Sequence, residues 1–177
     1  MEPQDFFGEL LIAMQKRLND KVPELKYINQ DIGQLEVVNP PVSWPCFLID
    51  MADTTYDDLA QSEQMGDLTI IGRLGFNPFS KTSDLQPEAV RRLGLAYYAL
   101  EKKIHAALHG WQPLKDDGTP LCQPFSRRRA YTEKREEDAF RVRGMQFTTG
   151  FNDDTASLNI SMMEIPPDLD AGIMEEE

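Results

Sequence analysis

The segment Trp44-Pro45-Cys46-Phe47-Leu48-Ile49-Asp50 decides the fold class of this chain. Its apolar residues run without interruption over a length typical of a β-strand. A strand that is apolar at every position is buried on both faces, so we expect it in the interior of a sheet. Asn39-Pro40-Pro41 separates this strand from the residues before it.

More strands follow this segment. Residues 52–66 are polar and acidic, and we expect a long loop there, of the kind that often carries function. Residues 68–76 alternate between apolar and polar side chains, which predicts a strand with one polar face. Residues 125–132 and 139–151 predict a hairpin, and the change of apolar phase at Gly144 predicts a bulge in its second strand.

Two helices frame these strands. Apolar residues spaced three and four apart predict an amphipathic helix from about Pro3 to Lys21 and a second from about Gln86 to His109, capped by Ser83 or Asp84. Residues 26–38 predict a weak strand or an irregular hairpin. The expected fold class is α+β, with two amphipathic helices packed on one face of a mixed or antiparallel sheet of four to five strands.

The acidic charge of the chain is concentrated at its end. Residues 152–177 hold eight of the 30 acidic residues and none of the 18 basic ones, so they carry two-thirds of the net charge of −12. We expect one domain over residues 1–151 and an acidic extension over residues 152–177 that is extended or disordered unless bound. An acidic chain repels nucleic acid and anionic membranes, so neither is expected as a primary ligand.

The sequence predicts an intracellular protein without a membrane anchor. Its first residues, Met1-Glu2-Pro3, do not form the basic n-region of a secretory signal, and no apolar stretch approaches the length of a membrane span. Cys46 and Cys122 are far apart and do not form a CxxC pair, which favours free, packed thiols in a reducing compartment.

Few residues indicate catalysis. His105 and His109 share a helix face and imitate a zincin helix, but Ala106 stands where such a site needs its glutamate, and no third ligand is apparent. A small metallohydrolase built on these histidines is one alternative function, and it requires a bound metal ion. We expect no catalytic residue, no metal ligand and no cofactor, and hence no enzyme.

Basic residues cluster in one part of the sequence. The cluster consists of Arg127, Arg128 and Arg129, followed by Arg141 and Arg143. On a regular strand Arg127 and Arg129 share one face, and Arg128 points away. Nearby acidic residues disfavour a nucleic-acid surface. A protein interface and a solvated face with local ion pairs stay open as interpretations.

The layout of the chain resembles the tail terminator (tail completion) proteins of long-tailed bacteriophages over residues 6–151. The resemblance is one of arrangement and is carried by residues 6–11, 32–35, 44–50 and 66–70, by the helix from Arg91 to Leu108, and by the arginine-bearing strand pair. It implies a compact subunit that assembles as a closed ring, usually of six. Such a ring caps the finished tail tube, ends tail polymerisation and joins the tail to the neck of the head.

The resemblance also implies the partners and the location of the protein. These are further copies of the chain, a tail tube protein and a neck connector protein, with DNA passing through the lumen without specific binding. The protein would be assembled in the host cytoplasm and reside in the tail or neck of the virion.

Ring contacts join unlike patches, so basic residues of one subunit are expected to meet acidic residues of the next. The candidate interface residues are Asp53, Asp57, Asp58, Arg127, Arg128, Arg129, Arg141 and Arg143.

Two other functions stay open besides the metallohydrolase. One is another head–tail neck connector with similar chemistry. The second, from a different class, is an acidic immunity or inhibitor protein that masks a basic partner as a monomer in a one-to-one complex.

Overall fold

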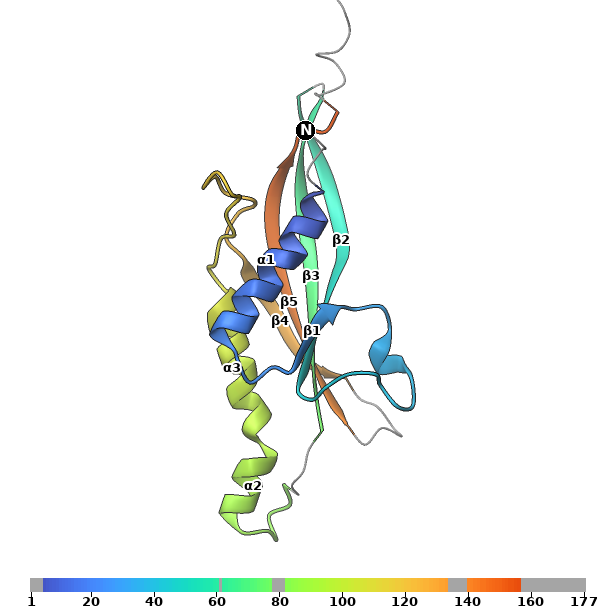
Figure 1. Ribbon diagram of the computed structural model, residues 1–177, viewed down its shortest axis with the longest axis vertical. Coiled ribbons are helices and arrows are strands. Elements are labelled where there is room, and N and C mark those ends of the chain that lie inside the picture. Colours follow the sequence, from blue (N-terminus) through green and yellow to red (C-terminus); the bar gives the residue numbers. More distant parts are fainter. Residues whose placement is uncertain (1–4, 61, 78–81, 134–139, 157–177) are drawn as a thin grey trace, which may run out of the picture.

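A five-stranded sheet in the order β1-β2-β3-β5-β4 forms the body of the protein in the computed structural model (Figure 1). The structure describes residues 5–60, 62–77, 82–133 and 140–156. Strand β1 runs parallel to β2, and the other neighbouring strands are antiparallel. In chain order the elements are α1 (Phe6–Lys21), β1 (Tyr27–Gln30), the 3-10 helix η1 (Gln34–Glu36), β2 (Cys46–Ala60), β3 (Glu63–Phe76), α2 (Glu88–Gly94), α3 (Ala96–Leu108), β4 (Ser126–Glu133) and β5 (Arg141–Asp153).

Helices α1 and α3 cover one face of the sheet, and α1 crosses it diagonally (Figure 1). Leu10, Met14 and Leu18 recur every fourth residue of α1, and all three are fully buried in the main core. Each such side chain contributes about 1.5–3 kcal/mol when it is removed from water, so this contact is a main source of stability. The α+β class, with helices packed on a mixed sheet, is confirmed.

A smaller core lies on the opposite face of the sheet, under the segment that contains η1. It is formed by Leu35, Cys46, Leu48, Phe140 and Val142. Phe47 and Ile49 belong to the main core and alternate along β2 with the residues of the smaller one. Two cores therefore explain why residues 46–49 are apolar at every position, as the sequence predicts.

Arg73 ties distant segments together on the face of the smaller core. Its guanidinium donates to Asp31 at 2.9 Å, to Glu36 at 2.8 Å and to Glu133 at 2.7 Å. The side chains of Arg73 and Asp31 are only 13% and 10% exposed. Because charge-assisted bonds are the strong ones, Arg73 fixes the segment after β1 against the end of β4.

The predicted loop over residues 52–66 is wrong. β2 and β3 continue through this segment as a long hairpin, paired from Cys46↔Gly75 to Ala60↔Glu63. Much of its outer half is exposed on both faces, since it extends past the helices. Without a core to face, the sequence there shows no apolar alternation, although the backbone is a regular ladder apart from two irregularities.

The predicted continuous helix over residues 86–109 is also wrong in part. It is divided into α2 and α3 at Leu95, whose backbone (φ −102°, ψ 3°) departs from α-helical geometry. Gly94 immediately precedes the break, and glycine is a poor helix former. The cap is Pro87 and not Ser83 or Asp84, whereas the predicted end near His109 agrees with the end of α3 at Leu108.

The predicted bulge at Gly144 is absent, because β5 pairs with β3 in unbroken register from Gln64↔Asp153 to Phe76↔Arg141. The apolar residues of β5 change phase because Val142 joins the smaller core, whereas Met145 joins the main one. The irregularity lies instead in β4, between Arg127 and Arg129.

The remaining expectations concern the ends of elements. The predicted helix over residues 3–21 is α1, and residues 1–4 lie outside the described part. The weak strand expected within residues 26–38 is β1, followed by η1 after a left-handed Gly33 (φ 87°). Strand β5 ends at Asp153, and residues 157–177 of the predicted extension lie outside the described residues.

Aromatic rings lie directly over glycines within the sheet. A Cβ atom on Gly72 would lie 2.2 Å from the Phe47 ring, and one on Gly144 would lie 2.2 Å from the Tyr131 ring. Real Cβ atoms do not approach other atoms so closely, so these positions accept a side chain only if the ring moves.

We predict that Gly72→Ala destabilises the fold by about 1–3 kcal/mol, because the fully buried Phe47 ring has to leave its place in the main core. Urea unfolding followed by circular dichroism measures the loss. Asp67→Ala on the exposed surface of the same strand is the matched control and should change stability by no more than about 0.5 kcal/mol. An unchanged midpoint for Gly72→Ala would contradict the packing described.

Candidate subunit interface

Both long edges of the sheet are open along much of their length. Strand β1 pairs with β2 only over Cys46–Ile49, and the Asp31 N–H then donates to the Ile49 carbonyl at 2.8 Å. From Asp50 onward, no strand in the described ranges pairs with the outer side of β2. β4 likewise pairs with β5 alone among the described strands. Open edges present unpaired N–H and C=O groups that can pair with another strand.

The open edge of β4 carries the arginine cluster. Arg128 and Arg129 are exposed, and Arg127 is half-buried. The Arg128 Nε atom donates to the Thr148 hydroxyl at 2.9 Å, and the Arg129 guanidinium lies 5.0 Å from the centre of the Tyr131 ring.

The expectation that Arg127 and Arg129 share a face is wrong. The bulge at Arg128 shifts the register, so Arg127 pairs with Phe147 of the main core, and Arg129 pairs with Gln146. These neighbours on β5 point to opposite faces of the sheet. Arg128 and Arg129 therefore occupy the face of the sheet that α1 and α3 do not cover.

The open edge of β2 carries the acidic candidates. Asp53, Asp57 and Asp58 are all exposed. Asp53 and Asp57 pair with Thr69 and Met65 on one face, and Asp58 points to the other and accepts a hydrogen bond from Gln64 at 2.8 Å.

Asp50 belongs to the same edge and was not among the predicted residues. Burial and the nearby Asp31 carboxylate raise the pKa of Asp50 above its ordinary value. Its carboxylate therefore lacks full compensation within the subunit and would be stabilised by an added cation.

The strand registers place the basic edge level with part of the acidic edge. Rows of paired residues run across the whole sheet, perpendicular to the strands. One row is Asp50–Ile71–Gln146–Arg129, and a nearby row is Asp53–Thr69–Thr148–Ser126.

Asp57 and Asp58 lie farther out, level with Asn152 and Asp153 of β5. This is four or five residues beyond Thr148, where the β4 ladder begins, or roughly 13–17 Å along the strand at about 3.3 Å per residue. The residues level with the arginines are thus Asp50 and Asp53.

The side chain of Arg143 is bonded to residues of its own subunit. Its guanidinium forms a two-pronged bond with Glu101 of α3, at 2.7 Å and 3.0 Å, and donates to Thr132 at 2.6 Å. The side chains of Arg143 and Glu101 are only 15% and 10% exposed. The structure therefore gives Arg143 a role in holding α3 to the sheet. Arg141 begins β5, opposite Phe76, and lies away from the arginines of β4.

The two histidines lie together on the surface of α3 and just beyond it, with ring centres 5.0 Å apart. His109 Nδ1 accepts the backbone N–H of Arg127 at 3.1 Å, which fixes the start of β4 against the helix end. Burial and the charge of Arg127 lower the pKa of His105. In the described part of the chain, no group of three His, Cys, Asp or Glu residues could hold a metal ion.

Both thiols are packed in the interior. Burial raises the pKa of Cys46 and of Cys122 to about 11, so neither is a thiolate at neutral pH. Among the helices of the described residues, none is both long and apolar enough to cross a membrane.

Comparison with known proteins does not assign a family. No family model matches the chain, and no curated protein matches it. Among solved structures, it is similar to a chain from the virion of a native gene transfer agent particle, with 12% identity and a TM-score of 0.49. The match covers 85% of this chain and all of the other.

We predict that Arg143→Met destabilises the subunit by about 3 kcal/mol, because it leaves the buried Glu101 carboxylate without its cation. Urea unfolding measures the loss, and light scattering measures any change in assembly. Adding Glu101→Leu should recover much of the stability, because it removes the orphaned charge. A stable Arg143→Met chain with impaired assembly would instead assign Arg143 to the interface.

Proposed function

We propose that this chain is a structural virion protein whose copies assemble edge to edge into a closed ring. The observation that carries the proposal is the pair of open, oppositely charged strand edges set at the same level of one sheet. In this arrangement the first half of β4, residues 126–129, lies beside residues 50–53 of β2 in the next subunit, because β1 already occupies the outer side of β2 level with the rest of β4. The resemblance in layout to tail terminator proteins supports a ring that caps the tail tube, ends tail polymerisation and meets the neck.

Strand direction favours this pairing. β2, β3, β5 and β4 are successively antiparallel, so β2 and β4 run in opposite directions at the two edges. Rotation about an axis along the strands preserves their directions. It therefore places β4 antiparallel to the neighbouring β2, and a short ladder over residues 126–129 and 50–53 would join one subunit to the next.

The charges of the two edges would determine the register of the contact and would add little to its free energy. Exposed ion pairs contribute about 0–1 kcal/mol each, so Arg128 and Arg129 against Asp50 and Asp53 cannot alone hold a ring. The backbone hydrogen bonds between the edges add further stability. Opposite charges steer the approach and disfavour the pairing of two like edges, so each subunit joins head to tail.

Other surface must add to the contact, because stable interfaces bury roughly 1,200–2,000 Å². Ile12 of α1 and Leu114, which precedes β4 in the chain, are 45% and 59% exposed and line one shallow hollow. These apolar side chains are available to a neighbouring subunit. The net charge of −12 also suits a conduit that DNA passes without adhering.

We predict that reversing the charge of either edge alone abolishes ring formation. Arg128→Glu with Arg129→Glu places two acidic edges together, and Asp50→Lys with Asp53→Lys places two basic edges together. Each variant should be monomeric in light scattering. A chain that carries all four changes again has complementary edges and should form rings, which controls for loss of folding.

Mixing the two edge variants should also restore assembly, because every contact in an alternating ring is again basic against acidic. Only rings with an even number of subunits can alternate, so a six-membered ring is recovered. Rings from a single edge variant, or a mixture that stays monomeric, would contradict the proposed contact. Negative-stain imaging with tail tube protein then tests the terminator role, for which the ring has to sit at the tube end.

A further inference from the structure

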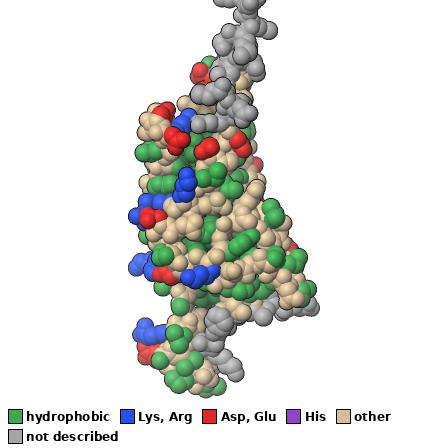
Figure 2. Space-filling view, viewed as in Figure 1, with side chains coloured by type: hydrophobic (Ala, Val, Ile, Leu, Met, Phe, Trp, Pro, Cys, Tyr) green, Lys and Arg blue, Asp and Glu red, His purple; other side chains and the backbone are tan. Residues whose placement is uncertain are grey.

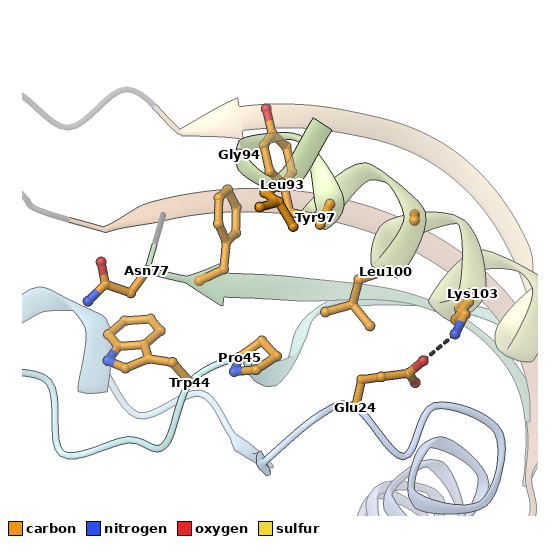
Figure 3. A pocket seen from close by; sticks show the side chains of 12 residues that line it. Glu24, Trp44, Pro45, Asn77, Leu93, Gly94, Tyr97, Leu100 and Lys103 are labelled. Atoms are coloured by element: carbon orange, nitrogen blue, oxygen red, sulfur yellow. Dashed lines mark hydrogen bonds and ion pairs between the residues drawn. The ribbon is translucent and has the colours of Figure 1, made fainter. Parts of the chain in front are cut away.

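An apolar groove lies between the start of α3 and the residues that precede β2 (Figure 3). Its volume is about 500 Å³. Trp44, Pro45, Phe76, Tyr97 and Leu100 line it, and the Phe76 and Tyr97 rings stack at 4.1 Å. A groove of this size and character fits several apolar side chains of a peptide.

The groove continues onto an exposed apolar surface. α2 projects at the lower end of the molecule in Figure 1, and Figure 2 shows hydrophobic side chains on the surface of this lower part. Leu93 lines the groove but is 70% exposed, and Leu95 is 42% exposed. Little of the described chain packs against α2, so these leucines are available to another segment.

Cations border the groove in a protein that is otherwise acidic. Lys103 lies at its rim and forms an ion pair with Glu24 (Figure 3). Arg91 and Arg92 belong to the helix that supplies Leu93. Arg92 is paired with Glu88 of the same helix, whereas the buried Arg91 Nε atom has no hydrogen-bond acceptor in the described residues. An apolar floor with the unsatisfied Arg91 guanidinium on the adjoining helix suits a ligand that is apolar and carries a carboxylate.

We propose that the C-terminal segment of the same chain, residues 169–177, occupies this groove. Ile173 and Met174 would lie on the apolar floor, and a carboxylate of Glu175, Glu176 or Glu177 would accept a hydrogen bond from Arg91. Residues 157–177 contain six acidic residues and no basic one, interspersed with isoleucine, leucine and methionine. This is the composition that the groove and its rim require.

The length of the chain selects the last residues of this segment. The end of β5 is level with Gln64, and the groove includes Phe76, which lies 12 residues farther along β3. That distance is roughly 40 Å at about 3.3 Å per residue. Extended chain from residue 157 therefore needs about 12 residues to reach the groove, which leaves residues 169–177 to enter it.

Attachment within one chain favours occupancy. A tethered segment has an effective concentration of the order of millimolar, so even a weak apolar contact fills the groove. The inference does not depend on ring formation, because the groove and the segment belong to one subunit.

Photo-crosslinking in the full-length protein tests this inference. A benzophenone amino acid replaces Leu93, whose exposure allows the change without disturbing the core. Mass spectrometry should find crosslinks to residues 169–177. Mixing isotope-labelled with unlabelled chains should show that both partners of each crosslink come from one chain.

Matched tail variants establish specificity. Ile173→Asp with Met174→Asp should reduce the crosslink by about tenfold or more, because two apolar contacts are lost. Ile160→Asp with Met162→Asp makes the same chemical change outside the docking residues and should leave the crosslink intact. Crosslinks to another segment, crosslinks between chains, or none at all would overturn the inference, and none of these outcomes bears on the paired edges.

Discussion

A mismatch of length between helices and strands governs this structure. α1 has 16 residues, which span about 24 Å, whereas the 14 residues of β3 span about 46 Å. Even a diagonal helix therefore covers only part of the sheet. The main core forms where helix and strand overlap, and the uncovered length of β2 and β3 becomes a polar hairpin whose outer edge, on β2, is open. The surface that we assign to assembly is a direct result of this incomplete coverage.

The sequence predicts those parts of the fold that face a core. The four-residue spacing in α1 and the apolar run at 46–49 both report burial, and both predictions are confirmed. Most of residues 52–60 and 62–65 are exposed, so the pairing that makes them strands leaves little trace in the apolar pattern. The break at Leu95 could not be predicted either. Leu93 continues the helical spacing of apolar residues across α2, but it is 70% exposed and does not belong to a core.

The candidate interface could be predicted only in outline. The arginine cluster is visible as composition, and Asp53 follows from its place in an acidic segment. The level of each residue across the sheet depends on the register of three strand pairs and on a bulge at Arg128, which the sequence does not reveal. Asp50 was missed because it ends an apolar strand. The bond between Arg143 and Glu101 could not be predicted, because the two residues are 42 positions apart.

The irregularities of the two outer strands have a consequence for the subunit before it meets its neighbours. β2 departs from regular pairing between Met51 and Asp53, and β4 does so between Arg127 and Arg129, in adjoining rows of the sheet. A kinked flank is a poor template for the flat stacking that leads to amyloid. The two irregularities therefore restrict edge-to-edge pairing to a neighbour whose own kink matches.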